Sequence, residues 1–395
     1  MQYSALYITN LFPLPGTNSA AFTIQRIKAM QRSGIDVVVV CLVNKTPPSV
    51  IALNIKGVIE WAVKQSAIPD RGEVDGIPVY YLKRFQLPQP FFGWYSHLFW
   101  SLQIMGELRR IISRVKPDVI ISAWLPSGVV ACKLGKYFGI PTVALAEGSD
   151  VNVLPVQLRY WHVARRILNE GAAAQVFVSN ALKEQAVQIG LNGKRMAVIH
   201  NGVDEEMFSI SKKDPATNIR NILAVGHLES VKGFQFLIDA LFIVSKKCSP
   251  PVHLTIVGEG SLESALLERV HELNLGGQVN FVPSMPQRDL ARYYQQADLL
   301  CVSSLQEGFP CVIVESMACG TPVVASRVGG IAEIVDSTSG ILVPRAEPQA
   351  LAEALIDAFE RKWDSNLIRK RVLKNFTWGH AGQAFLDLIR EVGNP

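Results

Sequence analysis

Two glutamates, Glu307 and Glu315, stand with seven residues between them in a stretch that combines a tight loop with a helix start. Glycine and proline in Gly308–Pro310 are typical of a loop, and the apolar run that follows predicts a helix over about Cys311–Ala318. This spacing places Glu307 before the helix and Glu315 about one turn inside it. Both carboxylates are therefore expected near the start of the same helix.

The start of that helix is suited to an anion. The first N–H groups of a helix, here those of Cys311 and Val312, have no acceptor within the helix and lie at its positive end. A diphosphate fits such a position. Carboxylates beside it are tolerated when they accept hydrogen bonds from sugar or ribose hydroxyls. The structural alternative is that Glu315 faces solvent and that Glu307 substitutes for a helix cap.

A second stretch with polar chemistry is Val225–Gly233, which follows a predicted strand and opens a helix. Gly226 and Gly233 allow a ligand to approach the backbone closely. Lys232 places a positive charge beside a helix N-terminus, which suits a phosphate oxygen, and His227 offers a second donor. The alternative is an ordinary loop between a strand and a helix, with a solvated lysine.

The elements that position these residues are short apolar runs that alternate with amphipathic stretches. Most runs are continuous in Val, Ile and Leu, which is typical of parallel strands covered on both faces. Stretches such as Phe22–Ser33 and Gly233–Lys246 predict the helices between them. The predicted strands are Ala5–Ile8, Val37–Val43, Val119–Ser122, Thr142–Ala146, Gln175–Val178, Ala197–Ile199, Ile222–Val225, His253–Val257, Val279–Val282, Leu299–Val302, Pro322–Ala325 and Ile341–Val343. Alternating strands and helices predict an α/β fold of doubly wound sheets.

Two series of strands predict two such domains. The boundary is expected within Asn201–Asp214, which combines an Asn-Gly turn signal with a polar run. A last helix is predicted over Phe376–Ile389. We therefore expect an N-terminal domain over 1–205, a C-terminal domain over 206–375 and a terminal helix within 376–395.

Composition excludes several classes of protein. The chain has 395 residues and a net charge of +5, an excess too small to indicate a nucleic-acid binder. The excess belongs to residues 1–208, with 21 Lys and Arg against 14 Asp and Glu, whereas residues 209–395 carry 18 against 20. The sequence shows neither a basic leader nor a run of about 18 apolar residues. Its six cysteines form no C-x-x-C pair, so we expect core cysteines, no zinc site and a reducing, cytoplasmic location.

Several motifs, in order along the second half, resemble the retaining GT-B glycosyltransferases of family 4, also called glycosyl transferases group 1. The stretches that carry the resemblance are Val198–Asp204, Val225–Gly233, Ile256–Gly260, Phe281–Pro283, Ala297–Ser304, Glu307–Ser326 and Val328–Val335. The first half is similar more weakly, through Phe12–Gly16 and Gly148–Asp150. The resemblance implies two Rossmann-like domains facing a central cleft, with the C-terminal helix crossing back to the N-terminal domain.

The resemblance also implies roles for individual residues. Lys232 would neutralise the donor diphosphate, Glu307 would bind hydroxyls of the transferred sugar, and Glu315 would hold the ribose hydroxyls. Gly16 would approach the diphosphate from the first domain, and the turn at Val282–Met285 would edge the base. Asp150 would orient the acceptor or the donor sugar. The implied catalytic set is Glu307, Lys232 and Asp150. The implied donor-binding set is Gly16, Gly226, His227, Lys232, Val282, Ser284, Glu307, Gly308, Phe309, Pro310, Cys311, Val312 and Glu315.

Two positions depart from the family pattern. His227 stands where the family usually has arginine, and histidine is a weaker phosphate clamp whose charge depends on pH. Glu147 stands where relatives often have histidine or arginine, so it either binds an acceptor hydroxyl or is merely part of the loop. For Asp150, the structural alternative is a helix N-cap.

The expected chemistry is independent of metal. No Asp-x-Asp motif stands in the second half, and Glu73–Asp75, next to Gly76–Pro78, predicts a turn between strands. Lys232, helix N-termini and His227 are then expected to stabilise the leaving nucleotide. The resemblance implies retention of configuration and a nucleotide-sugar donor, UDP- or GDP-linked, with no further cofactor.

Aromatic residues concentrate in Pro90–Met105, within the basic half of the chain. One interpretation is an apolar lip over 90–116 that contacts a membrane or a lipid-linked acceptor. The arginines expected to assist it are Arg84, Arg109, Arg110 and Arg114. The other interpretation is a buried helix whose large side chains face the core.

The sequence therefore predicts a cytoplasmic glycosyltransferase, peripheral to the inner face of a membrane. It is expected to move a sugar from a nucleotide-diphosphate sugar to a hydroxyl of a glycan, glycolipid or other glycoconjugate in surface polysaccharide assembly, with no nucleic-acid partner. The alternatives are a GT-B nucleotide-sugar epimerase and a non-catalytic nucleotide-sugar-binding subunit. A dinucleotide-dependent oxidoreductase is disfavoured because no G-x-G-x-x-G follows a strand, and Gly258–Gly260 stops short of it.

Overall fold

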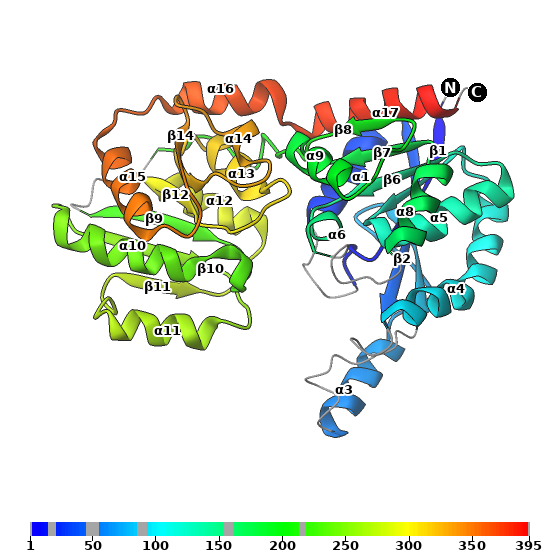
Figure 1. Ribbon diagram of the computed structural model, residues 1–395, viewed down its shortest axis with the longest axis horizontal. Helices are drawn as coiled ribbons and strands as arrows, with labels where there is room; N and C mark the ends of the chain where they lie inside the picture. Colours follow the sequence, from blue (N-terminus) through cyan, green and yellow to red (C-terminus); the bar gives the residue numbers. More distant parts are fainter. Residues whose placement is uncertain are drawn as a thin grey trace. The chain divides into compact units, whose positions relative to one another are not determined.

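The computed structural model describes residues 2–14, 21–44, 55–84, 93–153, 161–212 and 219–393. Its contacts divide the chain into two units (Figure 1). Unit 1 comprises Met1–His200 together with Ala381–Pro395, and unit 2 comprises Asn201–His380. Each unit is built around one sheet with its own helices. The α/β fold with two doubly wound sheets is therefore confirmed.

Unit 1 holds an eight-stranded sheet in the order β3-β4-β2-β1-β5-β6-β7-β8. Its strands are β1 (Tyr3–Thr9), β2 (Ile35–Asn44), β3 (Arg71–Val74), β4 (Ile77–Arg84), β5 (Val119–Ala123), β6 (Thr142–Ala146), β7 (Ala174–Phe177) and β8 (Met196–Val198). All neighbours are parallel except β3 and β4. The order reverses between β1 and β5, and this reversal is the switch point of a doubly wound sheet.

The antiparallel pair β3–β4 is the part of this sheet that the predicted strands omit. A turn between strands is present as expected, but it lies at Asp75 and Gly76, which both have positive φ, because Glu73 and Val74 belong to β3 and Val74 pairs with Ile77. Positive φ at both central residues is the geometry of the commonest two-residue hairpin turn. Strand β3 escaped prediction because its four residues are almost wholly exposed and carry no apolar run.

Helices of unit 1 pack on its sheet and contribute to its core, except α3, which projects away from the sheet (Figure 1). They are α1 (Ala21–Arg32), α3 (Ile55–Ser66), α4 (Gly93–Val115), α5 (Leu125–Phe138), α6 (Ser149–Asn152), α8 (Trp161–Gly171) and α9 (Asn180–Gln188). One core cluster joins Leu6, Val40 and Ile120 of the sheet to Leu108 of α4 and Leu134 of α5. Burial of such side chains is the main stabilising contribution to the sheet–helix layers.

The last helix, α17 (Trp378–Gly393), begins in unit 2 and ends in unit 1. Within unit 1, Gly382 lies so close to α1 that a Cβ on it would stand 2.4 Å from the carbonyl oxygen of Ala29. Arg195, which precedes β8, forms an ion pair of 2.5 Å with Glu391. The helix therefore packs on unit 1, as the fold prediction required of a C-terminal crossover helix.

Unit 2 holds a six-stranded, fully parallel sheet in the order β11-β10-β9-β12-β13-β14. Its strands are β9 (Arg220–Val225), β10 (Val252–Val257), β11 (Val279–Val282), β12 (Leu299–Val302), β13 (Val323–Ser326) and β14 (Gly340–Val343). This is the strand order of dinucleotide-binding sheets. The switch point lies between β9 and β12, so the loops that leave these two strands emerge side by side.

Helices again cover the sheet of unit 2, and α10 packs on α15 in its core. The helical elements are the 3-10 turn η1 (Ser230–Lys232), α10 (Phe234–Lys247), α11 (Glu263–Glu272), α12 (Gln287–Gln296), α13 (Cys311–Ala318), α14 (Ile331–Ile334), α15 (Pro348–Glu360) and α16 (Ser365–Asn375). The predicted bounds of α13 are confirmed. Helix α16 is not among the helices predicted from the sequence; the carboxylate of Asp364 caps it by accepting from the N–H groups of Asn366 and Leu367.

Candidate functional site

The loops after β9 and β12 meet at the switch point of unit 2. Lys232 comes from the first loop and Glu307 from the second, and Lys232 Nζ lies 2.7 Å from Glu307 Oε1. The side chain of Lys232 is 26% exposed and that of Glu307 is 10% exposed. The two charges are therefore close and partly shielded from water.

Hydrogen bonds hold these two loops together independently of the ion pair. Ser304 Oγ donates to Glu307 Oε1 at 2.7 Å. The N–H of Leu305 donates to the carbonyl of Val231 at 2.8 Å, and Ser303 Oγ donates to the carbonyl of Lys232 at 3.1 Å. Backbone and side-chain hydrogen bonds thus fix the positions of Lys232 and Glu307.

Close packing of backbone continues around Glu307 and Gly226. Gly329 has φ +50°, and a Cβ there would overlap the carbonyl oxygen of Glu307. Gly258 has φ +153°, and a Cβ there would stand 2.0 Å from the carbonyl oxygen of Gly226. Both positions need glycine because of conformation and space together. Gly226, a predicted donor-binding residue, therefore lies where the loop after β9 packs its backbone against the loop after β10.

His227, next to Gly226, has an exposed ring. Its neighbour Glu229 accepts hydrogen bonds from the hydroxyl and the N–H of Ser261, at 2.8 and 3.1 Å. These bonds, and to a lesser degree the nearby His227, lower the pKa of Glu229. His227 thus sits on the same rim of the sheet as Lys232 but is more accessible.

Helix α13 begins at Cys311, with Pro310 at its N-cap, and the Pro310 side chain makes no capping hydrogen bond. Its positive end lies in the segment that directly follows Glu307. Pro310 has no N–H, so its place in the predicted donor set can rest only on shape. The ring of Phe309 is buried against that of Phe376, with centroids 5.7 Å apart, while Cys311 Sγ accepts from Asn201 Nδ2 at 3.7 Å. Gly308 and Val312 flank this turn and are half-buried.

Glu315 lies on the buried side of α13 and not on a solvent face, with an exposed fraction of 5%. Gln287 Nε2 donates to its Oε1 at 2.7 Å, and the hydroxyl of Tyr294 donates to its Oε2 at 2.8 Å. Burial raises the pKa of Glu315, and these two hydrogen bonds oppose that effect. The alternative of a solvent-facing helical glutamate is therefore wrong.

Val282 and Ser284, predicted to edge the base, belong to the end of β11 and the loop after it. Val282 is half-buried and its carbonyl accepts from the N–H of Gly258 at 2.9 Å, whereas Ser284 is exposed. The loop runs directly into α12, whose first residue is Gln287. The predicted base segment is thus joined in sequence to a side chain that bonds to Glu315.

In unit 1, Gly16 lies outside the described residues. Glu147, at the end of β6, binds a buried arginine from α1: Arg26 Nη1 lies 2.5 Å from Glu147 Oε1, and Nη2 lies 3.0 Å from Oε2. Arg26 also donates to the hydroxyl of Tyr7 at 3.0 Å. Burial lowers the pKa of Arg26, but the Glu147 carboxylate and the Tyr7 hydroxyl together outweigh burial and hold that pKa above its usual range. Both oxygens of Glu147 are engaged, an arrangement that neither alternative in the sequence foresaw.

Asp150 is fully buried and is bound by backbone. Its carboxylate accepts from the N–H groups of Leu125 (2.9 Å), Glu147 (3.0 Å) and Gly148 (2.8 Å). Burial raises the pKa of Asp150 to about 6, and these hydrogen bonds oppose the rise. The N-cap alternative is wrong in position, because the N-cap of α6 is Gly148. In this structure Asp150 ties the loops after β5 and β6 together.

The aromatic stretch falls at the start of α4, and the side chains of residues 91–103 lie outside the described residues. From Ile104 onward, Ile104, Leu108, Ile111 and Ile112 are buried in the core of unit 1. The exposed positions in this part of the helix include Arg109, Arg110 and Arg114. Arg84 was wrongly expected on the surface, since it is 5% exposed and burial lowers its pKa to about 10. Among the described residues, no helix has both the length and the apolarity that a membrane crossing needs.

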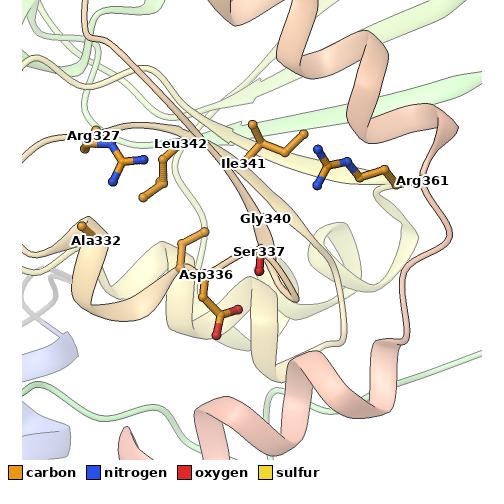
Figure 2. Close-up of a pocket in the computed structure, with 9 residues that line it drawn as sticks. Arg327, Ala332, Asp336, Ser337, Gly340, Ile341, Leu342 and Arg361 are labelled. Carbon is orange, nitrogen blue, oxygen red and sulfur yellow. The ribbon is translucent and has the colours of Figure 1, made fainter.

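A cavity of about 310 Å³ lies along β14, in another part of unit 2 (Figure 2). It is lined by Arg327, Ala332, Val335, Asp336, Ser337, Gly340, Ile341, Leu342 and Arg361. Figure 2 shows Arg327 and Arg361 at opposite ends of it. Arg361 is already bound to Asp357 at 2.6 Å, and Asp336 to Arg371 at 2.7 Å. No residue of the predicted donor set lines this cavity.

Sequence reasoning missed the residues that support the predicted ones. Tyr294, Gln287 and Arg26 lie in no motif, and Ser304 is only the last residue of the motif Ala297–Ser304; each reaches its partner through the fold. A weak signal existed for Ser304, which stands three residues before Glu307 in a strand-end loop. For Arg26, the only signal was an arginine within a predicted amphipathic helix.

Comparison with known families agrees with this geometry. Residues 205–374 match the family model described as Glycosyl transferases group 1, and residues 21–202 match the Glycosyl transferase 4-like domain. The chain is 28% identical over 373 residues to the putative teichuronic acid biosynthesis glycosyltransferase TuaC of Bacillus subtilis, covering 89% of this chain and 87% of TuaC. It is also 28% identical over 298 residues to a D-inositol 3-phosphate glycosyltransferase of Paenarthrobacter aurescens, covering 69% and 72% of the two chains.

Solved structures show the same fold. Sucrose-phosphate synthase from Thermosynechococcus elongatus superposes with a TM-score of 0.79 at 21% identity, covering 98% of this chain and 99% of that one. HepE of Anabaena, in complex with UDP-glucose, gives a TM-score of 0.72 at 20% identity, covering 99% and 100%. At these identities the likeness establishes the architecture alone.

The buried pair in unit 1 gives a test of stability. Replacing Arg26 by Met leaves the Glu147 carboxylate buried without its cation, so we expect the free energy of unfolding to fall by about 3–5 kcal/mol. Lys28→Met removes an ion pair with Asp75 whose side chains are 30% and 56% exposed, and its cost is expected to stay below about 1 kcal/mol. Urea unfolding of both variants measures the difference. Equal costs would contradict a structural role for the Arg26–Glu147 pair.

Proposed function

The chain belongs to the GT-B glycosyltransferases of family 4, and from this premise we propose that it transfers a hexose from a nucleotide-diphosphate sugar to a hydroxyl with retention of configuration. The observation that carries the proposal is the contact of 2.7 Å between Lys232 and Glu307 at the switch point of unit 2. This is the place where doubly wound sheets bind nucleotides. It offers a cation for phosphate next to a carboxylate for sugar hydroxyls.

On the donor side, the diphosphate would compete with Glu307 for the Lys232 ammonium. The N-terminus of α13 would add its dipole, and the exposed His227 would add a donor when protonated. Glu307, released in part from Lys232, would accept hydrogen bonds from the sugar. Glu315, inside the same helix, would accept from the ribose. The two glutamates would thus bind the two hydroxyl-bearing ends of one donor molecule.

Mechanistically, we propose that bond breaking is assisted by charge stabilisation of the leaving nucleoside diphosphate. Lys232 and the helix dipole are fixed before the reaction, which makes them effective at the atoms where negative charge develops. The acceptor hydroxyl would attack from the face that the nucleotide leaves, and the departing phosphate oxygen would take its proton. No metal ion is required in this proposal.

On the acceptor side, we propose a glycan, glycolipid or other glycoconjugate used in surface polysaccharide assembly, at the inner face of a membrane. Two relatives support this class: TuaC, and the amylovoran biosynthesis glycosyltransferase AmsK of Erwinia amylovora, which is 31% identical over 186 residues, 45% of this chain and 46% of AmsK. The exposed arginines of α4 would face anionic lipid headgroups.

Loss of either member of the central pair is expected to stop the reaction. Lys232→Ala and Glu307→Gln should each lower the rate of nucleotide release from the donor by at least about 100-fold, because each removes a group fixed at the reacting atoms. Lys247→Ala, at the far exposed end of α10, is the matched control and should keep the wild-type rate. Near wild-type rates in either site variant, with unchanged melting temperature, would contradict the assigned roles.

The donor is identified by ligand-dependent stability. A cognate nucleotide sugar at about 100 times its Kd should stabilise the chain by about 2.7 kcal/mol through mass action. UDP-, GDP- and ADP-sugars are compared by thermal shift, with UDP- or GDP-sugars expected to give the larger shift. No shift with any of the three would contradict a nucleotide-sugar site.

Membrane contact is tested by flotation with vesicles. Vesicles rich in anionic lipid should carry the chain upward at low salt and release it at high salt, because screening weakens the attraction of exposed arginines. Neutral vesicles serve as the control. Absence of flotation with anionic vesicles at low salt would contradict a role for 90–116 at a lipid surface.

A further inference from the structure

Two neutral donors hold the buried carboxylate of Glu315. The Tyr294 hydroxyl lies 2.8 Å from Oε2, and Gln287 Nε2 lies 2.7 Å from Oε1. A buried ionised carboxylate is costly unless it is hydrogen-bonded or paired. Glu307, the other glutamate of the motif, is paired with Lys232, whereas the hydrogen bonds shown for Glu315 come from uncharged groups.

The number of hydrogen bonds that a carboxylate can accept explains why neutral donors and a charged partner have different consequences. A carboxylate has about four lone-pair sites, two on each oxygen. One neutral donor on each oxygen of Glu315 leaves about one site on each. An arginine in their place would engage both oxygens in a bidentate pair and neutralise the charge. The observed arrangement suits a ligand that brings two adjacent hydroxyl donors.

Tyr294 is held rigidly in this position. It is fully buried, its ring packs edge-on against Phe208 with centroids 5.9 Å apart, and its carbonyl accepts from Thr321 Oγ1 at 2.7 Å. Thr321 lies three residues after the end of α13, so the segment that follows the helix carrying Glu315 also binds the backbone of its hydroxyl donor. The direction of the Oε2 bond is therefore set by packing.

Gln287 links the carboxylate to a second part of the predicted donor site. It is the first residue of α12 and follows the loop after β11 that contains Ser284. A nucleotide base bound at that loop would place its ribose near the residue that orients Glu315. The loop and the carboxylate are thereby connected through one amide side chain.

We propose that Tyr294 and Gln287 are positioning residues that keep Glu315 ionised and aimed at the 2′ and 3′ hydroxyls of a ribonucleotide. This inference rests on the proposed function. Among the described residues, the titratable groups near Glu315 include the thiol of Cys311 on α13, the thiol of Cys319 at the C-cap of this helix, and Arg369 on α16, whose guanidinium donates to the carbonyls of Ala318 and Phe208. Tyr294 and Gln287 are the groups that bond to the carboxylate itself.

The test compares Tyr294→Phe and Gln287→Met with Tyr293→Phe. Tyr293 is half-buried on the same helix, and within the described chain its hydroxyl is not bonded to Glu315. Binding of UDP, GDP and ADP, and of their 2′-deoxy forms, is measured by calorimetry. Tyr294→Phe and Gln287→Met should each weaken ribonucleotide binding about tenfold while changing deoxynucleotide binding less. Tyr293→Phe should bind both like the wild type.

The pH dependence separates positioning from simple structural support. The ionised form of Glu315 accepts the ribose hydroxyls, so affinity should fall as pH drops through its raised pKa. Loss of the Tyr294 hydroxyl removes a bond that opposes the rise, and the fall in affinity should then begin at a higher pH. A merely structural defect would weaken ribo- and deoxynucleotides equally at every pH, and that result would overturn the inference.

If Tyr294→Phe lowers the melting temperature without ligand, ribonucleotide and deoxynucleotide binding are compared in Gln287→Met instead, because Gln287 is only half-buried. If the wild type binds a nucleotide and both variants behave like Tyr293→Phe, this inference is overturned while the proposed function stands. If no nucleotide binds the wild type, the proposed function fails and the inference fails with it.

Discussion

Strands β9 and β12 are neighbours in the sheet although β10 and β11 separate them in the sequence, and this reversal of order sets the geometry of unit 2. Two loops that begin about 75 residues apart leave the same edge of the sheet, and backbone hydrogen bonding joins them. The attraction between Lys232 and Glu307 then acts over 2.7 Å in a partly shielded place. Close-packed backbone at Gly258 and Gly329 also holds each of these loops against the loop that follows its other neighbouring strand, β10 or β13.

The two glutamates of one motif are stabilised by opposite means. Glu307 stands at the loop, partly exposed, where a lysine balances its charge. Glu315 lies inside the helix, where Tyr294 and Gln287 compensate for burial with dipoles. A cation exchanges readily between a carboxylate and a phosphate, whereas neutral donors leave the charge of the carboxylate available to hydroxyls. The two environments therefore suit different parts of one ligand.

Unit 1 uses buried charge differently. Its sheet also reverses, between β1 and β5, but the charged groups near that reversal bind each other and the backbone. Arg26 engages both oxygens of Glu147, and Asp150 accepts from three backbone N–H groups across two loops. A buried ion pair adds little net stability but is costly to break. These contacts hold the ends of β5 and β6, and the loops that follow them, in place.

The sequence by itself determined the α/β class, the positions of most strands, the bounds of α13 and the pairing of Glu307 with a helix start. These depend on local patterns: continuous Val, Ile and Leu runs for buried parallel strands, and Gly-Phe-Pro before an apolar helix. Only the tertiary structure decided that Glu315 faces α12, that Arg26 neutralises Glu147, and that Arg84 is buried. Such contacts join residues distant in the chain. Strand order and helix packing determine them, and neither leaves a periodic trace in the sequence.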